Sequence, residues 1–166
     1  AENGYRHATG TLYRGARFVL SETARTTPAA RDLAEALVRA VGAEPVWIDR
    51  RRHDELTALT SHLPHLLNFA LMRLAMARTA QDSEVYALAA GGFDGATRLA
   101  RTTESMVAGM LSTNAEQVRR AAAELRAHLD TLDALLDDTP ALERELAAIV
   151  EARRAYTAAY GERMIT

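Results

Sequence analysis

The chain has 166 residues, of which 48% are hydrophobic and 25% are charged, with a formal net charge of -2 at pH 7. This length suits one ordinary domain, or one domain with the tail of another, and the composition is that of a folded globular protein. The slight negative charge argues against a nucleic-acid partner. The sequence has no cysteine, no signal peptide and no membrane-length apolar run, so we expect a soluble, cytoplasmic protein.

The first part of the chain predicts a strand, a helix and a second strand. Residues 17–21 and 45–49 are short runs rich in β-branched and aromatic side chains, which favour strands. Between them the pattern predicts a helix from about Pro28 to Val41, ended by Gly42. Two strands cannot bury both of their faces alone. We therefore expect residues 1–49 to be the tail end of a domain whose sheet lies upstream.

Residues 50–166 predict a mainly α domain. Asp49 can cap a helix whose apolar spacing continues to Leu74, and Pro64 within it must either kink that helix or open a second one. A shorter helical stretch follows Asp82 and is broken at Gly91 and Gly92.

A long helix is predicted to begin near Thr103 and to carry an apolar seam that alternates spacings of four and three residues. Such a seam needs a partner helix, either the last predicted helix, 139–160, or the same helix of a second subunit. The seam consists of Leu111, Ala115, Val118, Ala122, Leu125, Leu129, Leu132 and Leu136.

Polar residues cluster around Pro64. On an unbroken helix Asp54, Ser61 and His65 lie within roughly 20° of one line, whereas His53 and His62 lie about 180° apart and cannot serve one site unless Pro64 bends the chain. The cluster suits a polar binding site. It equally suits partly buried histidines bonded to backbone carbonyls that the proline exposes.

A metal site is the weaker interpretation of the same cluster. His62 and His65 stand three residues apart, and Asp54 could add a carboxylate ligand. No glutamate base or third histidine stands at a familiar metal-site spacing, so we expect no metal.

A second group of candidate residues follows the paired glycines. Gly91 and Gly92 allow a ligand close to the backbone, and Arg98 offers a planar pair of donors that suits a carboxylate. Together they favour a site for a small anionic molecule. The alternative is a flexible connection between helices with a surface arginine.

These motifs, taken together, resemble the C-terminal region of prephenate dehydrogenases. The resemblance holds in order and spacing from about residue 10 to residue 115. Its specific part is the run Ser-His-Leu-Pro-His at 61–65 followed by Gly-Gly-Phe at 91–93 and Thr-Arg at 97–98. Leu-Tyr-Arg-Gly at 12–15, His-Asp at 53–54 and Asn114 also match.

The resemblance implies a helical dimerisation domain of the 6-phosphogluconate-dehydrogenase C-terminal-like type, preceded by a remnant of a Rossmann-like sheet. It implies part of a homodimeric enzyme of tyrosine biosynthesis, which oxidises and decarboxylates prephenate to 4-hydroxyphenylpyruvate with NAD or NADP. The catalytic histidine and the glycine-rich nucleotide loop are expected upstream of Ala1. No catalytic residue is therefore expected in this chain, and the chain alone is expected to be inactive.

The resemblance also assigns roles to residues of this sequence. His65 faces the dicarboxylate substrate, Arg98 pairs with one of its carboxylates, and Gly91 brings the backbone close to it. Ser61 is counted with these substrate-binding residues. Asp54 and His62 orient and support the site.

Two departures leave the substrate open. Val107 stands where the family carries a tryptophan near the substrate, and Gly95-Ala96 replaces a bulkier, more polar pair. Arogenate or 4-amino-4-deoxyprephenate are therefore alternatives to prephenate. The alternative of another class is a catalytically silent helical module for dimerisation or ligand sensing.

Overall fold

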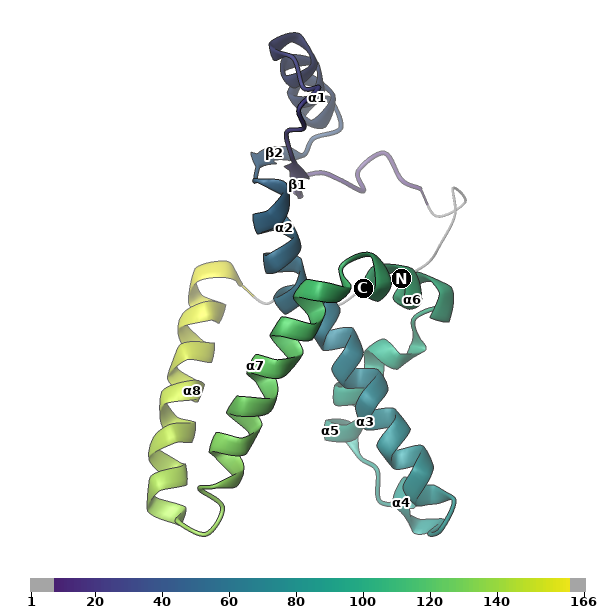
Figure 1. Ribbon diagram of the computed structural model, residues 1–166, viewed down its shortest axis with the longest axis vertical. Coiled ribbons are helices and arrows are strands. Elements are labelled where there is room, and N and C mark those ends of the chain that lie inside the picture. Colours follow the sequence, from purple (N-terminus) through teal and green to yellow (C-terminus); the bar gives the residue numbers. More distant parts are fainter. Residues whose placement is uncertain (1–7, 162–166) are drawn as a thin grey trace. The chain divides into compact units, whose positions relative to one another are not determined.

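The computed structural model describes residues 8–161, which form two short strands and a succession of helices (Figure 1). The chain begins with β1 (Arg17–Leu20), α1 (Pro28–Ala40) and β2 (Glu44–Trp47). The two strands are parallel, with Arg17 opposite Glu44 and Leu20 opposite Trp47. The predicted strand, helix and strand are confirmed.

Local sequence sets both ends of α1. The Thr27 side chain accepts a hydrogen bond from the Ala30 N–H, and Pro28 occupies the first turn, where no N–H is needed. After the helix, Gly42 adopts a φ of 79°, and its N–H bonds to the Arg39 carbonyl. A positive φ is easy for glycine, so the chain turns here and enters β2.

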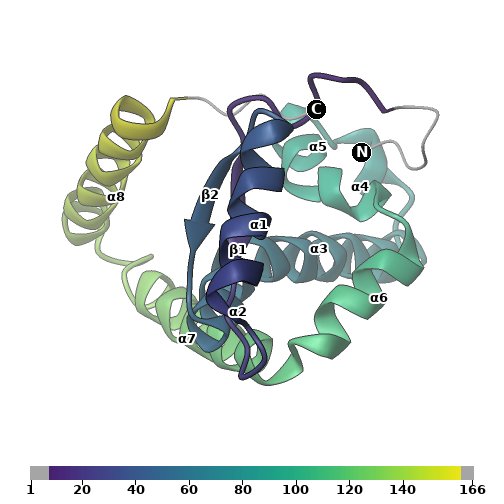
Figure 2. The same cartoon turned by 90° about the horizontal axis from the view of Figure 1, so that it is seen from above.

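α1 packs against β2 (Figure 2). Trp47 Nε1 donates to Glu35 Oε1 at 2.7 Å, and the Arg31 guanidinium lies 4.3 Å from the indole centroid. The Trp47 hydrogen bond and then the Arg39 hydrogen bond lower the pKa of Glu35. Part of the apolar surface of this region is uncovered, because the following side chains are exposed: Leu12, Tyr13, Phe18, Val19, Leu33, Leu37 and Val41.

The helices that follow begin at a capped end and contain one wide turn. α2 (Arg50–Thr57) starts after Asp49, whose side chain accepts a hydrogen bond from the Arg52 N–H. A π-helical turn, η2 (Ala58–His62), leads directly into α3 (Leu63–Thr79). Pro64 therefore lies in the first turn of α3. This is the second of the two predicted outcomes, in which the proline opens a new helix.

Three short elements follow, and one prediction about them is wrong. They are α4 (Glu84–Ala87), α5 (Gly91–Thr97) and η3 (Arg98–Arg101). α4 ends before the glycine pair, and Gly91 is the first residue of α5, so the glycines begin a helix instead of breaking one.

The predicted long helix is also interrupted. α6 (Glu104–Thr113) ends at Asn114, whose φ of -118° and ψ of 29° are not helical, and α7 (Ala115–Asp133) begins after it. The seam therefore does not run along one helix. The predicted last helix is confirmed as α8 (Thr139–Tyr160), where the Asp138 side chain accepts from the Ala141 N–H.

The chain divides into two compact units, one reaching to Val118 and the other starting at Arg119. The predicted boundary between residues 49 and 50 stays a prediction. In the first unit the most buried apolar residues include Ala58, Leu63 and Val107.

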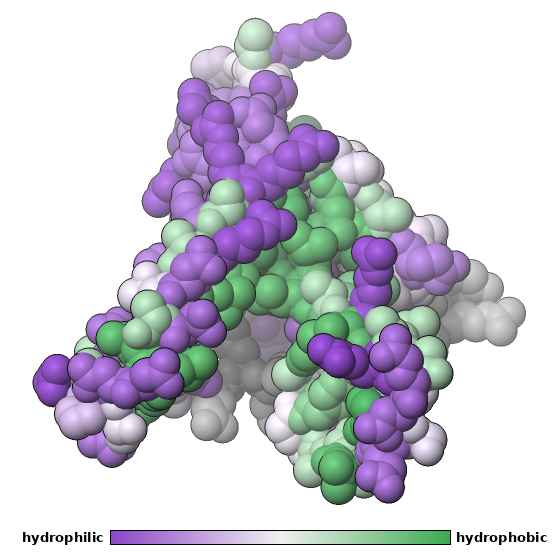
Figure 3. Space-filling view, turned by 60° about the horizontal axis from the view of Figure 1, so that its bottom comes forward, coloured by the Kyte–Doolittle hydropathy of each residue, from purple (hydrophilic) through white to green (hydrophobic). Residues whose placement is uncertain are grey.

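In the second unit, α8 has no buried residue, and Leu129 and Leu136 are 53% and 62% exposed. α8 thus covers neither Leu129 of α7 nor Leu136, which follows α7. Hydrophobic residues accordingly reach the surface in the space-filling view (Figure 3).

One half-buried amide, that of Asn68, ties α3 to η3. Asn68 Oδ1 accepts the Leu99 N–H at 2.8 Å, and Asn68 Nδ2 donates to the Pro64 carbonyl at 2.9 Å. The first bond satisfies the Leu99 N–H, a backbone donor at the start of a 3₁₀ turn that has no acceptor within the turn. The second bond holds the Asn68 side chain against its own helix.

Replacing this amide should destabilise the protein. Asn68→Ala leaves the Leu99 N–H without its acceptor, so we expect the free energy of unfolding to fall by about 1–2 kcal/mol in urea titration. Gln81→Ala is the control, because Gln81 is exposed and its side chain makes no hydrogen bond within residues 8–161. That control should stay within about 0.5 kcal/mol of the parent. Equal effects of the two substitutions would contradict the role of Asn68.

Candidate functional site

The π-turn between α2 and α3 is the local feature that shapes the site. The Leu63 N–H bonds to the Ala58 carbonyl, five residues back, and Ala58 is 1% exposed. Pro64 explains why the helix widens here. It has no N–H to give to Thr60, and its ring would collide with the Thr60 carbonyl in a straight α-helix.

This turn overturns the assumption of an unbroken helix. An additional residue in one turn moves everything after it by about 100° around the axis. The angles predicted for Asp54, Ser61 and His65 assumed a regular α-helix, so they do not apply across the π-turn. His62 also lies close enough to His53 for their charges to interact, although an unbroken helix would place the two on opposite sides.

His62 is held from a distant part of the chain. Asn114, at the break between α6 and α7, places its Nδ2 atom 3.2 Å from His62 Nδ1 and 2.7 Å from the Asp54 carbonyl oxygen. Partial burial lowers the pKa of His62, and the neighbouring His65 and His53 lower it further, whereas Asp54 acts in the opposite direction. His62 is therefore neutral near pH 7.

His65 is fixed by its own helix. Its Nδ1 lies 3.0 Å from the Ser61 carbonyl oxygen, which can only accept, so Nδ1 carries a proton and donates. The predicted bond from a histidine to a backbone carbonyl is confirmed for His65, whereas His62 bonds to a side-chain amide instead. His65 Nε2 and the half-buried Ser61 hydroxyl make no hydrogen bond within residues 8–161.

Asp54 contributes through both its backbone and its side chain. Its carbonyl receives Asn114, and its carboxylate accepts from His53 Nδ1 at 3.1 Å. The carboxylate is 45% exposed, so this pair adds little stability. Asn114 thus joins Asp54 and His62 in one hydrogen-bonded group at the π-turn, and His65 lies close enough to His62 to affect its pKa; together the four residues form the polar cluster.

Arg98 presents a cation without a partner. It is the first residue of η3, its side chain is exposed, and it makes no ion pair or hydrogen bond with any residue in the described range. Asn68 fixes the backbone beside it to α3, which also carries His65. Gly91 has open space where a Cβ would lie, so its backbone is accessible.

The roles of two residues, Asn68 and Asn114, were not predicted from the sequence. Asn68 stands alone as a polar residue in the apolar run Leu-Leu-Asn-Phe-Ala-Leu-Met at 66–72, and that isolation was the available signal. Asn114 matched the family, but nothing in its surroundings indicated a bond to residues 52 and 60 positions earlier. Val107, where a tryptophan was expected, is 4% exposed.

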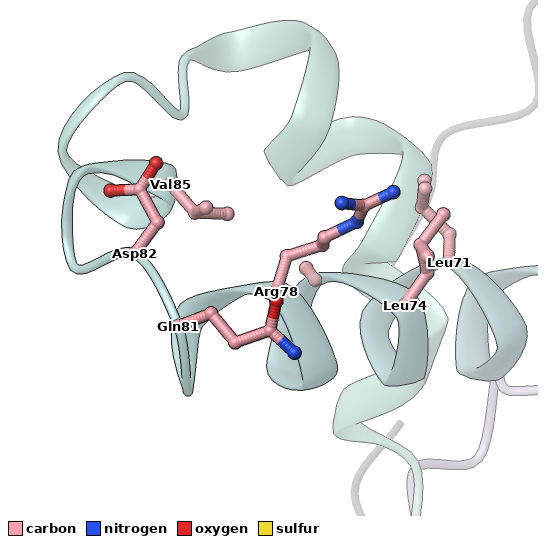
Figure 4. A pocket seen from close by; sticks show the side chains of 7 residues that line it. Leu71, Leu74, Arg78, Gln81, Asp82 and Val85 are labelled. Carbon is pink, nitrogen blue, oxygen red and sulfur yellow. The ribbon is translucent and has the colours of Figure 1, made fainter.

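Two hollows on the surface are lined by residues of α3, but not by the polar cluster. One of about 740 Å³ is lined mainly by apolar residues of α3. Another, of about 310 Å³, lies between α3 and α4, where Arg78 extends from α3 while Asp82 points away from it (Figure 4). Neither is lined by Asp54, His62, His65 or Arg98.

The described range offers no alternative metal or membrane site. Residues 8–161 contain no group of three or more His, Asp or Glu side chains that could hold a metal ion. None of the helices in that range is both long and apolar enough to cross a bilayer.

Comparison with known proteins identifies the family of this chain. Residues 49–150 match the family described as prephenate dehydrogenase, dimerization domain. The prephenate dehydrogenase of Lactococcus lactis is 29% identical over 131 residues, which are 79% of this chain and 35% of that protein. The chain therefore spans about a third of the length of this curated relative.

Solved structures share the fold. Prephenate dehydrogenase from Aquifex aeolicus, in complex with hydroxyphenyl propionate and NAD+, has a TM-score of 0.88 at 23% identity, covering 94% of this chain and 55% of that one. Synechocystis arogenate dehydrogenase has a TM-score of 0.77 at 25% identity, covering 88% of this chain and 54% of that one. The chain belongs to the prephenate dehydrogenase dimerization domain family.

Proposed function

We propose that this chain is the substrate-binding and dimer-forming part of a dehydrogenase that oxidatively decarboxylates prephenate or a close analogue. The observation that carries the proposal is Arg98, an exposed guanidinium without a partner in residues 8–161. Asn68 fixes its backbone to the helix that carries His65. Prephenate has two carboxylates, and an arginine can give one of them two parallel donors.

The remaining residues orient the substrate. His65 has its Nδ1 proton committed to the Ser61 carbonyl, so its free Nε2 is an acceptor when the ring is neutral and a donor when it is charged. The accessible backbone at Gly91 and the unbonded Ser61 hydroxyl add polar contacts. Asp54 and His62 support the cluster through Asn114. This chain therefore binds and positions, while the catalytic base belongs to another part of the enzyme.

The hydride acceptor also belongs elsewhere. NAD or NADP, when bound, would supply that acceptor, and the Aquifex aeolicus relative is in complex with NAD+. The sequence contains no Gly-x-Gly-x-x-Gly loop, so its residues do not form the usual phosphate cradle. The uncovered apolar surface of the β1–α1–β2 unit fits the edge of the larger sheet that would carry the loop.

We further propose a homodimer built from the helices. The matching family is described as a dimerization domain, and α8 has no buried residue. Its apolar residues nevertheless repeat at helical spacing, which a partner helix can cover. Those with the most exposure are Leu146, Ile149, Val150, Tyr156 and Tyr160.

The ring substituent of the substrate is left open between prephenate, arogenate and 4-amino-4-deoxyprephenate. An arogenate dehydrogenase is among the structures with this fold. Val107 also provides no aromatic wall, since it is small and buried. Side-by-side assays of the three substrates with a full-length enzyme that carries this region would decide the preference.

Arg98 provides the first test of the proposed site. We expect the chain to bind hydroxyphenyl propionate with a Kd of roughly millimolar order in NMR titration. Loss of a charge-assisted pair should weaken binding roughly 10- to 100-fold in Arg98→Ala, and Arg98→Lys should recover only part of it. Arg78→Ala is the matched control, because Arg78 is also exposed and without a partner in residues 8–161.

Two results would contradict this assignment. One is a parent chain that does not bind the ligand at all. The other is an Arg98→Ala chain that binds within about threefold of the parent while Arg78→Ala does the same.

Turnover provides the second test. The chain alone should give no reduced nucleotide from prephenate with NAD or NADP, because its residues do not provide the nucleotide loop. The Lactococcus lactis enzyme serves as the positive control in the same absorbance assay. Measurable turnover by the chain would show that the catalytic machinery is not elsewhere.

A further inference from the structure

The amide of Asn114 joins two elements that the sequence separates widely. Asn114 lies at the break between α6 and α7, and its Nδ2 atom reaches both α2 and the π-turn. One contact is to the Asp54 carbonyl oxygen at 2.7 Å, and the other is to His62 Nδ1 at 3.2 Å. An NH₂ group has two hydrogens, so it can serve both acceptors at once.

The Asp54 carbonyl fixes which way this amide faces. A carbonyl oxygen can only accept, so the nitrogen of the Asn114 amide, and not its oxygen, must face Asp54. The same nitrogen then faces His62 Nδ1, which must accept through its lone pair. A neutral imidazole whose Nδ1 accepts carries its proton on Nε2. Within residues 8–161 this Nε2–H has no hydrogen-bond partner.

We propose that Asn114 is a positioning residue, which holds His62 as a neutral imidazole whose Nε2–H donates to an oxygen of the anionic substrate. The proposal rests on the proposed function for the identity of the ligand, and on the two Asn114 contacts for the state of the ring. It gives His62 the role of an uncharged donor, which is complementary to the proposed role of Arg98 as a cation.

The surroundings of His62 favour the same state. Protonation would place an N–H at Nδ1 against the Asn114 NH₂ group, so the ring could gain a proton only by breaking that contact. The titratable groups that act on its pKa are His65 on α3 and His53 and Asp54 on α2. The two histidines and partial burial lower the pKa of His62, and Asp54 offsets only part of this.

The parent protein tests the proposal without any substitution. Imidazole ¹⁵N shifts of the labelled chain report the tautomer of each histidine, and loss of a signal in His62→Gln assigns His62. We expect the Nε2–H tautomer and a pKa below the usual value of about 6.5. A His62 ring with its proton on Nδ1 would overturn the proposal.

Asn114→Asp tests the cause. It keeps the shape of the side chain but replaces the donor by an acceptor, so the His62 proton should move to Nδ1 and its pKa should rise by about one unit or more. Asn68→Asp is the matched control, since it makes the same change at an amide that bonds to Pro64 and Leu99. The carboxylate added in Asn68→Asp can shift the pKa of His62, but the His62 tautomer should stay unchanged. An unaltered tautomer in Asn114→Asp would refute the role of Asn114.

Added hydroxyphenyl propionate tests the donor role. The His62 Nε2–H resonance should move downfield on titration in the parent and lose that response in Asn114→Asp. A parent signal that stays in place while the ligand binds would overturn the donor role. The tautomer is measured without ligand, so a failure of the proposed function would leave it as predicted, whereas a failure of the Asn114 assignment would not.

Discussion

Pro64 imposes the constraint on which the rest of the site depends. Because its nitrogen cannot donate and its ring excludes the Thr60 carbonyl, the helix cannot pass through this point in regular α-geometry. It widens into the π-turn at Ala58–His62 and restarts as α3. The turn re-aims His62 so that Asn114 can reach it. The Pro64 carbonyl accepts from Asn68, which also bonds to the Leu99 N–H and so fixes the backbone of η3 next to Arg98.

The polar cluster and the adjoining η3 turn are consequently held by hydrogen bonds of side-chain amides more than by ion pairs. Asn68 and Asn114 each bond to a backbone carbonyl and to one further group, and each joins residues at least 31 positions apart in the chain. Neutral hydrogen bonds of this kind are directional and are not screened by salt, unlike the exposed pair His53–Asp54. Arg98 makes no ion pair or hydrogen bond within residues 8–161, as the proposed recognition of an anionic ligand requires.

The sequence predicted elements better than it predicted their geometry. The strands at 17–21 and 45–49 and the helix at 139–160 follow from local chemistry, such as Thr27, Gly42 and Asp138, and they are confirmed. The π-turn escaped because helical-wheel arithmetic assumes regular turns. The break at Asn114 and the bridge at Asn68 escaped because both depend on partners distant in sequence. The site assignments for His65, Arg98, Gly91, Ser61, Asp54 and His62 stay predictions.

The exposed apolar residues of the second unit support the proposal that the chain forms a homodimer, in which a second copy covers them. α8 has no buried residue, and Leu129 and Leu136 are uncovered. Sedimentation equilibrium of the chain tests this most directly. Twice the mass of one chain at micromolar concentration is predicted, because an obligate interface of more than ~2,000 Å² resists dilution. The mass of a single chain under the same conditions would contradict the account.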